Sequence, residues 1–442
     1  MSFPPHQNYN SSNVDWLGKV PSDWKITPLK SIARVVNGYP FASERFSPDG
    51  QWPLIRIRDL NASEPATYFD GAFVAQAAID NNDILIGMDG DFSVGRWMGS
   101  TPALLNQRMC AVRADDDATH RFLFYALPIP LQAINTVTYA TTVKHLSSSQ
   151  VSQCRFAIPP ADQLRQIADF LDFETTKIDV AIAAQERLIE LLVEKSAATI
   201  SRAISKGLNF DVPYSDSRLD WLGQIPAHWL VQPIRKLARL ESGHTPSRSK
   251  PEYWIEEDCT IPWVTTGDVK GLRDGRAIYL DDTAVKISAT GLANSSARLL
   301  PANTVFLSRT ASVGFSGIMG REMAVSQDFA AWICGTELLP EYLLFCLRSM
   351  QPLFQSLMIG STHKTIYMPD IEKLMIPVPP MEEQRKIASR LIRDKPKTEQ
   401  LIDRARESIE LLRERRSALI TAAVTGKIDV RGHAQNNERE AA

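Results

Sequence analysis

The sequence predicts an α+β protein in which two homologous mixed α/β domains alternate with two long helices. Three observations lead to this prediction. Two sequence blocks recur along the chain, helical apolar periodicity follows each copy of the second block, and short strand-like runs fill the stretches between them. At roughly 100–200 residues per domain, the 442 residues allow two to four domains with sizeable cores.

Composition narrows the class of protein. The chain has 49 Lys and Arg against 51 Asp and Glu, a net charge of −2, and 44% hydrophobic residues. This is the profile of a globular protein and offers no global attraction to nucleic acid, so any such binding needs local basic surfaces or partner proteins. No stretch approaches the ~18 apolar residues of a membrane helix, and the N-terminus lacks a signal pattern. We therefore expect a cytoplasmic protein.

The cysteines predict no disulfide framework. There are five, an odd number, and they are scattered without a Cys-x-x-Cys pair. That pattern argues against a disulfide-stapled fold and against a zinc ribbon. We expect buried free thiols.

The first repeated block carries paired tryptophans. The segment Asp15–Trp24 returns as Asp220–Trp229, and the similarity continues to Gly38 and Gly243. The tryptophans are Trp16, Trp24, Trp221 and Trp229. They could stack on bases, but they lie in the repeated part of the chain. We therefore expect them to anchor each globular segment against a helix end.

The second repeated block begins at Ile158-Pro159-Pro160 and returns at Val378-Pro379-Pro380. Its similarity extends without a gap to Ile189–Leu192 and Ile409–Leu412, at a constant offset of 220 residues. The chain therefore consists of variable and constant segments in alternation. The second variable segment is 15 residues longer than the first.

Both constant segments predict long helices. Each follows Pro-Pro with acidic or amide residues, which suit the first turn of a helix. Apolar or small residues then alternate in steps of four and three, the pattern of a helix–helix seam. The seam positions are Ile178, Ile182, Gln185, Ile189, Leu192, Ser196, Thr199 and Ala203 in the first copy, and Thr398, Ile402, Ala405, Ile409, Leu412, Arg416, Leu419 and Ala423 in the second. We expect the helices to end near Gly207 and Gly426, and Pro396 to divide the second into a short and a long helix.

The variable segments predict mixed α/β structure. Short apolar runs between Gly, Asp and Asn residues are typical of strands, and apolar residues near 122–125 and 342–345 are typical of helices. The strand candidates are 53–57, 84–86, 261–264 and 304–307. Offset 220 also aligns Gln107 with Gln327. Both variable segments should therefore share one fold while their surfaces differ.

No motif for catalysis is present in the sequence. It has no phosphate-binding Gly-rich loop with Lys-Ser/Thr, no His-Glu-x-x-His, and only dispersed histidines. Neither Pro-Pro pair follows the Asn or Asp with which an adenine methyltransferase holds its base. The run Pro369–Lys373 is similar to a nuclease motif, but we interpret it as a helix start. We expect no catalytic residue and no metal site.

Basic and hydroxyl residues in the variable segments are the DNA-binding candidates. Lys and hydroxyl groups suit phosphate contacts, and Arg suits the bidentate recognition of guanine. The alternative for each residue is ordinary solvated charge. The candidates are Arg56, Arg58, Arg96, Arg108, Thr142 and Lys144 in the first variable segment, and Arg248, Lys250, Lys270, Arg273, Arg309, Thr362 and Lys364 in the second.

Taken together, these motifs resemble the specificity subunit of type I restriction–modification systems. The resemblance rests on the D-W-L-G-x-[VI]-P-x-x-W block, the [IV]-P-P-x-[DE]-[QE]-x-R-x-I-A helix start, and the closing segment Ala422–Asp429. It covers nearly the whole chain, from Asp15 to Asp429. Pro396 and Arg416 in the second helix depart from the pattern.

The resemblance implies an architecture and a function. Each variable segment would be a target recognition domain that reads one half of a bipartite, asymmetric DNA target. The helices would pair as an antiparallel coiled coil and spacer, which gives the chain pseudo-twofold symmetry. They would also dock two methyltransferase (modification) subunits, joined by motor–nuclease restriction subunits. S-adenosylmethionine, ATP and Mg would belong to those partners, with no cofactor in this chain.

The resemblance and the repeats together divide the chain into seven segments. We expect an N-terminal constant piece (1–24), target recognition domain 1 (25–158), spacer helix 1 (159–207), a linker and constant piece (208–229), target recognition domain 2 (230–378), spacer helix 2 (379–428) and a flexible tail (429–442). Two other functions stay open: a coiled-coil scaffold without a DNA role, and a self-contained nuclease or methyltransferase.

Overall fold

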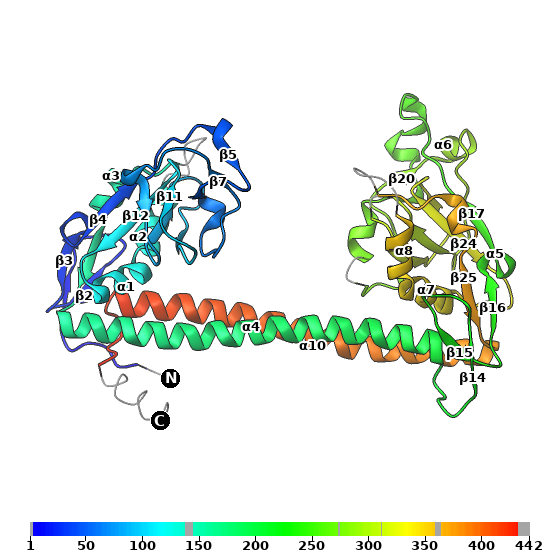
Figure 1. The fold of residues 1–442 in the computed structure, drawn as a ribbon. Helices are drawn as coiled ribbons and strands as arrows, with labels where there is room; N and C mark the ends of the chain where they lie inside the picture. Colours follow the sequence, from blue (N-terminus) through cyan, green and yellow to red (C-terminus); the bar gives the residue numbers. More distant parts are fainter. Residues whose placement is uncertain (1–2, 138–144, 273–274, 311, 359–363, 432–442) are drawn as a thin grey trace. The chain divides into compact units, whose positions relative to one another are not determined.

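The structure is a computed structural model, and it describes residues 3–137, 145–272, 275–310, 312–358 and 364–431. The described residues form two compact units. The first unit comprises residues of 1–184 and 408–442, and the second comprises those of 185–407. Figure 1 shows the fold of the chain, coloured from the N-terminus to the C-terminus.

The first unit contains a four-stranded sheet, a five-stranded sheet, the strand pairs β1-β2 and β13-β3, and three short α-helices, together with parts of the long helices. Its strands are β1 (Tyr9–Ser11), β2 (Lys19–Pro21), β3 (Lys25–Pro28), β4 (Ala33–Asn37), β5 (Phe46–Ser47), β6 (Trp52–Ile55), β7 (Tyr68–Phe69), β8 (Ala78–Ile79), β9 (Ile84–Gly87), β10 (Val94–Arg96), β11 (Ala103–Leu105), β12 (Met109–Ala114) and β13 (Arg155–Ile158). Its short helices are α1 (Asp117–Ala126), α2 (Pro128–Val137) and α3 (Ser148–Gln153). The main sheet orders are β10-β9-β12-β4 and β5-β7-β6-β11-β8. We call β10-β9-β12-β4 the large sheet of this unit because it contains the longest strands, β4 and β12.

The second unit repeats this plan. Its strands are β14 (Tyr214–Asp216), β15 (Gln224–Pro226), β16 (Leu230–Pro233), β17 (Ala238–Ser242), β18 (Ile261–Val264), β19 (Tyr279–Leu280), β20 (Lys286–Ile287), β21 (Val305–Ser308), β22 (Ser316–Met319), β23 (Ala324–Val325), β24 (Phe329–Cys334) and β25 (Met375–Val378). Its short helices are α5 (Ile234–Leu237), α6 (Ala289–Ala293), α7 (Pro340–Ser349), α8 (Gln351–Leu357) and α9 (Met368–Ile371). The large sheet has the order β17-β24-β21-β22-β19, and β20-β18-β23 form the small one.

The central strands of the two main sheets correspond between the units, although the sheets differ in their number of strands. β4, β12, β9 and β10 match β17, β24, β21 and β22, and all of these pairs are antiparallel. The parallel pair β6–β11 matches the parallel pair β18–β23. The prediction that the variable segments share one fold is therefore confirmed. The expected strands and the helices near 122–125 and 342–345 are also present, as β6, β9, β18, β21, α1 and α7.

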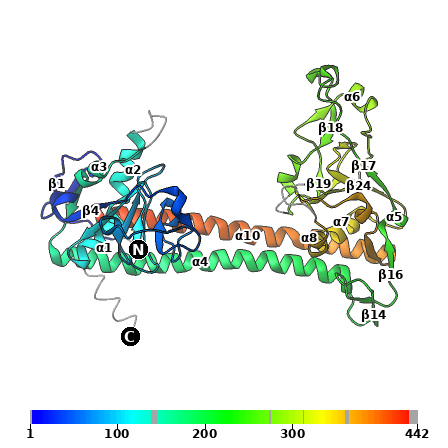
Figure 2. The same ribbon diagram turned by 45° about the horizontal axis from the view of Figure 1, so that its top comes forward.

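Two long helices join the units: α4 (Ala161–Lys206, 46 residues) and α10 (Met381–Val424, 44 residues). In the first unit the start of α4 lies beside the end of α10 (Figures 1 and 2), and Arg416 forms an ion pair with Asp179 at 2.9 Å. The same hydrophobic cluster holds Leu164 and Ile167 of α4 with Ala423 and Val424 of α10. The two helices are therefore antiparallel there, as expected.

Burial supports the predicted seam at all but one position. The candidate seam residues Ile182, Ile189, Leu192, Ile402 and Leu412 are half-buried, and Ile409 is buried. The exception is Thr199, which is exposed and donates its hydroxyl to Lys195 O at 2.7 Å. Its neighbour Ile200 is half-buried in its place, because a step of four residues follows Ser196 instead of a step of three.

The prediction that Pro396 divides the second helix is wrong. α10 continues through Pro396, which lies exposed on its surface. Proline removes one helical N–H and crowds the carbonyl four residues earlier, but an exposed carbonyl can be hydrated. Ion pairs of Arg390 with Asp394 and of Lys395 with Glu399 flank the proline. They support the turns on either side of it.

In each unit a buried tryptophan lies where one long helix begins and the other ends. We call these two sites the tryptophan junctions. In the first unit, Trp24 is 5% exposed and donates to Gln163 Oε1 in the first turn of α4 at 3.2 Å. In the second, Trp229 is 4% exposed and donates to Glu383 Oε2 in the first turn of α10 at 3.0 Å. These bonds confirm that the buried tryptophans are structural anchors.

The glycines that cap the helices complete these junctions. Gly426 and Gly207 have φ of +68° and +71°, and Trp24 and Trp229 lie directly against them. A tyrosine hydroxyl caps each end: Tyr9 donates to Gly426 O at 3.0 Å, and Tyr214 donates to Lys206 O at 3.4 Å. The N-terminal piece therefore does for α10 what residues 214–229 do for α4.

Two smaller expectations concern the C-terminus and the cysteines. Asp429 N donates to Pro4 O at 2.7 Å and Val430 is buried, so this start of the expected flexible tail packs within the first unit. The tail's remaining residues 432–442 lie outside the described residues.

The expectation of buried free thiols holds in part. All five cysteines are free, and Cys259 and Cys334 are half-buried instead of buried.

Candidate nucleic-acid interface

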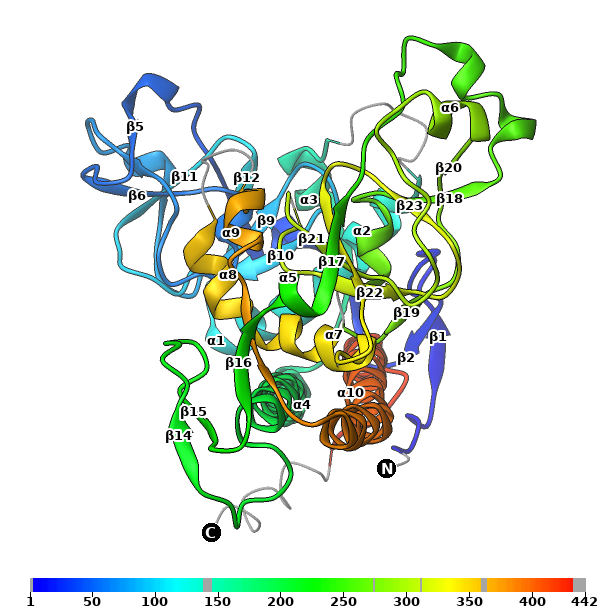
Figure 3. The same cartoon turned by 90° about the vertical axis from the view of Figure 1, so that its right-hand side faces the viewer.

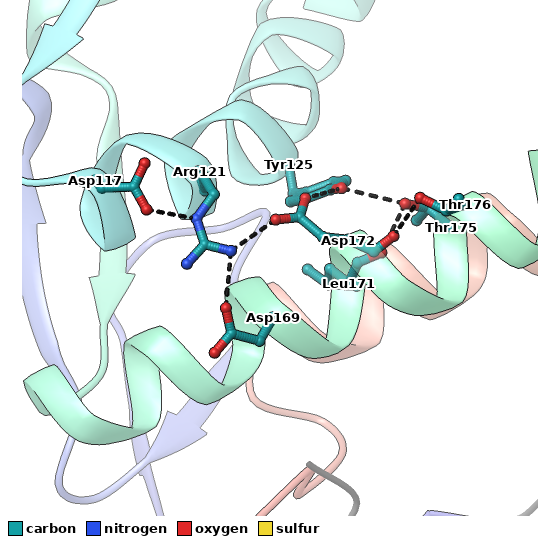
Figure 4. A network of polar contacts seen from close by, with 8 residues as sticks. All are labelled: Asp117, Arg121, Tyr125, Asp169, Leu171, Asp172, Thr175 and Thr176. Carbon is teal, nitrogen blue, oxygen red and sulfur yellow. Dashed lines mark hydrogen bonds and ion pairs between the residues drawn. The ribbon is translucent and has the colours of Figure 1, made fainter. Parts of the chain in front are cut away.

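The candidate interface lies at the end of each large sheet that is remote from the long helices. In the first unit, β12 leads into α1, whose N-cap Asp116 accepts from Thr119 N at 2.8 Å. α1 in turn contacts α4 through Arg121, which bonds Asp172 (Figure 4). Arg108 precedes β12 and therefore lies at its other end, about 20 Å away at 3.4 Å per residue.

Three chain segments meet at this end of the first sheet. The Asp89 carboxylate accepts from Arg108 Nη1 through one oxygen and lies 2.8 Å from His145 Nδ1 through the other. The backbone joins the same segments, because Met88 N donates to Arg108 O at 2.9 Å and Leu146 N donates to Met88 O at 2.7 Å. We call Asp89, Arg108 and His145 the first loop cluster.

The first loop cluster is accessible and strongly polarised. The side chains of Arg108 and His145 are 64% and 56% exposed, and that of Asp89 is 19% exposed. Burial raises the pKa of Asp89, but the hydrogen bonds from His145 and Arg108 outweigh it and hold the pKa below its ordinary value. The hydrogen bond to Asp89 raises the pKa of Arg108. The cluster therefore contains a firmly ionised carboxylate and guanidinium.

The second unit has the same backbone arrangement at the equivalent end. Arg309 N donates to Asp328 O at 2.9 Å, and Ile366 N donates to Arg309 O at 2.9 Å. A bridge between Thr310 and Thr365 replaces that between Asp89 and His145. These bonds make Asp328 the counterpart of Arg108, so the two units present opposite charges at one structural position.

The second unit holds this end with different side chains. Gln327 accepts from Thr245 Oγ1 through its side chain and from Arg309 Nη2 through its backbone, both at 2.6 Å. Lys364 is exposed and lies two residues before Ile366, whose backbone N–H donates to Arg309 O. We call Arg309, Gln327, Asp328 and Lys364 the second loop cluster.

Two repeated glycines allow the sheet edge to approach these loops. A Cβ at Gly38 would lie 1.9 Å from Asn106 O, and one at Gly243 would lie 1.6 Å from Val325 O. Any side chain would displace the turn that carries Arg108 or the one that carries Asp328. This contact gives the physical reason for the repeat between Gly38 and Gly243.

Three other predicted residues of the first unit lie outside its loop cluster. Arg58 is exposed and donates to Thr67 Oγ1 at 2.5 Å, and Arg56 is half-buried with its guanidinium 6.0 Å from the Phe46 ring. Arg96 is half-buried and stacks at 3.8 Å on Phe124 of α1, toward the helices. The predicted Thr142 and Lys144 lie outside the described residues.

The predicted residues of the second unit are also dispersed. Arg248 stacks at 3.8 Å on Trp254, and Lys250 lies 3.8 Å from Glu252. Lys270 is exposed in the 3₁₀ turn Asp268–Leu272. Only Arg309 and Lys364 lie in segments that meet, through the bond from Ile366 N to Arg309 O, while Arg273 and Thr362 lie outside the described residues.

Asp89, His145, Gln327 and Asp328 were not predicted from the sequence as candidates. The predicted residues were cations and hydroxyl groups, so the carboxylate that orients Arg108 was not among them. The alignment of Gln107 with Gln327 was the available signal. Arg108 and Asp328 follow these glutamines directly and immediately precede β12 and β24.

Three further features of the described residues concern metal binding, the run Pro369–Lys373 and membrane insertion. Among them, no group of three or more His, Cys, Asp or Glu side chains could hold a metal ion. The run Pro369–Lys373 begins in α9, so its interpretation as a helix start is confirmed. Within the described ranges no helix is long and apolar enough to cross a membrane.

Two homologous α/β units with unlike loop clusters, joined by long helices, define a class of two-domain repeat proteins. The family model of the type I restriction modification DNA specificity domain matches the chain twice, at residues 21–188 and 226–410. The chain belongs to this family.

Known relatives agree with this assignment. The chain is 28% identical to the type I restriction enzyme EcoBI specificity subunit of Escherichia coli, over 86% of this chain and 81% of the relative. It is 21% identical to the MjaVIII specificity subunit of Methanocaldococcus jannaschii, over 93% and 95% of the two chains. A solved structure concerned with complex assembly of the type I R–M system shares the fold, with a TM-score of 0.66, 18% identity, and coverage of 92% of this chain and 99% of the other.

Proposed function

We propose that this chain is the DNA sequence-recognition subunit of a type I restriction–modification complex. Each unit would read one half of a bipartite, asymmetric target with the loops at the remote end of its large sheet. The chain itself would carry no catalytic residue and no cofactor.

One observation carries this proposal. The two units share backbone hydrogen bonds at the loop ends but present different side chains there, with Arg108 in one and Asp328 in the other. A scaffold gains nothing from such divergence on a shared framework. A protein that reads two different half-sites requires it, because direct readout depends on the donors and acceptors presented to the bases.

The proposal includes partners. Two methyltransferase subunits would dock on the chain and supply S-adenosylmethionine chemistry, and restriction subunits would supply ATP- and Mg-dependent cleavage in the cytoplasm. The formal charge of −2 supports a need for partners, because a nearly neutral chain gains little from counterion release on DNA.

Methylation mapping tests the proposal. The chain is expressed with the methyltransferase subunit of its own system, and methylated adenines are located across a randomised DNA library. We expect one two-part motif with an unread spacer, which requires both proteins. Methylation by this chain alone would instead establish a self-contained enzyme, and methylation without sequence preference would support a scaffold.

A further inference from the structure

We infer that Asp89 is a positioning residue that orients Arg108 to recognise a guanine in one half of the DNA target. The inference rests on the proposed function and adds a specificity determinant, because it assigns one base of the half-site to one side chain. Its basis is the geometry of the first loop cluster.

Arg108 has the form of a base-reading arginine. Its side chain is 64% exposed, and Asp89 accepts from only one end of its guanidinium, Nη1. A guanidinium is a planar fork with five N–H groups, so a carboxylate on one edge fixes its plane and leaves another edge for a ligand. Guanine offers O6 and N7 side by side in the major groove, and these acceptors match such an edge.

The charges of the cluster favour specificity over general attraction. The Asp89 carboxylate cancels the charge of Arg108, so the pair contributes little to counterion release on the phosphate backbone. A residue used only for phosphate contact would gain from the absence of that carboxylate. The pair is better suited to directional hydrogen bonds with a base edge.

His145 fixes the other side of the carboxylate. Its Nδ1 lies 2.8 Å from Asp89 Oδ1, and because a carboxylate only accepts, the Nδ1–H group donates to it. Asp89 and His145 also form a backbone bridge between their segments. Asp89 therefore has little freedom to turn away from Arg108.

The second unit lacks this device. Asp328 replaces Arg108 there, and Thr310 replaces Asp89. A carboxylate accepts hydrogen bonds from the exocyclic amines of cytosine or adenine and repels the acceptors of guanine. The two half-sites should therefore differ at the bases that face these positions.

The test compares variants in the complex with its methyltransferase subunit. Arg108→Ala and Arg108→Lys are expressed in turn, and preference for each base is read from the mapped methylated sites. Lysine keeps the charge without the fork and guards against loss of folding. We expect preference for guanine at one position of one half-site to fall about 5-fold to 150-fold in Arg108→Ala. Arg108→Lys should lose part of it, and the other half-site should not change.

Asp89→Asn and a control complete the test. Asp89→Asn should weaken preference at the same position and at no other, a pattern that general destabilisation would not produce. Arg155→Ala removes an equal charge from an exposed residue of β13 and should leave all preferences unchanged. A wild-type motif whose preferences stay within twofold in the Arg108 variants would overturn this inference alone. A wild-type complex without any motif would overturn the proposed function as well.

Discussion

The two units keep the same fold but attach it to their helices in different ways. In the first, Arg121 of α1 lies among three carboxylates and bonds Asp169 at 2.8 Å and Asp172 at 2.7 Å (Figure 4). Tyr125 OH donates to Asp172 at 2.6 Å and lies 3.1 Å from Thr175 Oγ1. Burial lowers the pKa of Arg121, but the hydrogen bonds to Asp172 and Asp169 outweigh burial, so the pKa lies above its ordinary value.

Among its described residues, the second unit has no counterpart of this network. Glu341, Phe345 and Ile392 occupy the positions of Arg121, Tyr125 and Asp172. There the buried Gln384 of α10 accepts from Leu339 N at 2.9 Å, just before α7, which lies between the large sheet and the helices (Figure 3). Arg276 adds an ion pair with Asp403 of α10.

The difference shows which contacts belong to the repeat and which to each copy. The tryptophan junctions recur in both units, whereas the contact between domain and helix is particular to each. An exchange of residues 36–156 with a relative would therefore leave Asp172 and Thr175 on α4 without their partners Arg121 and Tyr125. Extending the exchange to residue 176 keeps that network together.

The largest expected effect tests the shared junction. Trp24→Ala and Trp229→Ala each remove a buried indole and its hydrogen bond, and each should lower the free energy of unfolding by about 3–5 kcal/mol. Because the junctions match, the two losses should agree within about 1 kcal/mol. Urea unfolding followed by circular dichroism measures both. A loss at only one tryptophan would break the equivalence of the junctions.

A second prediction compares the two long helices. Thr176 of α4 occupies the position of Pro396 in α10. Pro396→Thr restores a helical N–H, and it should raise the free energy of unfolding by about 2 kcal/mol, given the helix propensities of the two residues. Thr176→Pro should destabilise the chain by at least as much. A Pro396→Thr variant less stable than the wild type would mean that the proline turn is required by its surroundings.

The fold was largely predictable because its signals are local or repeated. Helix seams, Gly caps and Pro-Pro starts depend on neighbouring residues, and the repeat showed that both variable segments fold alike. The prediction at Pro396 was wrong because one exposed proline costs a helix less free energy than a break at that residue. A break would interrupt the packing of the 44-residue α10. The prediction at Thr199 was wrong because the sequence does not show whether the seam continues three or four residues after Ser196. Both Thr199 and its neighbour Ile200 can occupy such a position, and the structure buries Ile200.

The candidate site was less predictable because it joins residues distant in sequence. Arg108 was named from its chemistry, but its pairing with Asp89 and His145 depends on the meeting of three loops. Arg96 was named for the same reason, yet it packs on Phe124. Exposed cations and packed ones look alike in a sequence, since the difference lies in tertiary contacts.

A third prediction separates the two kinds of attachment. Arg121→Ala leaves Asp169 and Asp172 without their cation and should lower the free energy of unfolding by about 2 kcal/mol. Arg276→Ala breaks a more exposed pair, with side chains 33% and 52% accessible, and should cost under about 1 kcal/mol. Urea unfolding at low and high salt measures both. Equal costs would show that the network in Figure 4 adds nothing beyond a surface ion pair.

The smallest expected effect concerns Tyr125 and its response to pH. Burial, followed by the bond to Asp172, raises the pKa of Tyr125 from 10.0 to about 12. The unfolded chain therefore loses this proton at lower pH than the folded one, so the stability that Tyr125 contributes is complete below pH 10 and is lost as pH rises toward 12. Tyr125→Phe copies Phe345 of the second unit and should cost about 1 kcal/mol at pH 8.

The cost of Tyr125→Phe should shrink between pH 10 and 12, because the wild type alone loses the contribution of this hydroxyl. Urea unfolding at pH 8, 10 and 11 follows the difference, with Tyr39→Phe on the surface as the control. A cost that stays constant across this range would mean that the hydroxyl acts through packing. The attachment of the first unit would then differ from that of the second in shape but not in its polar chemistry.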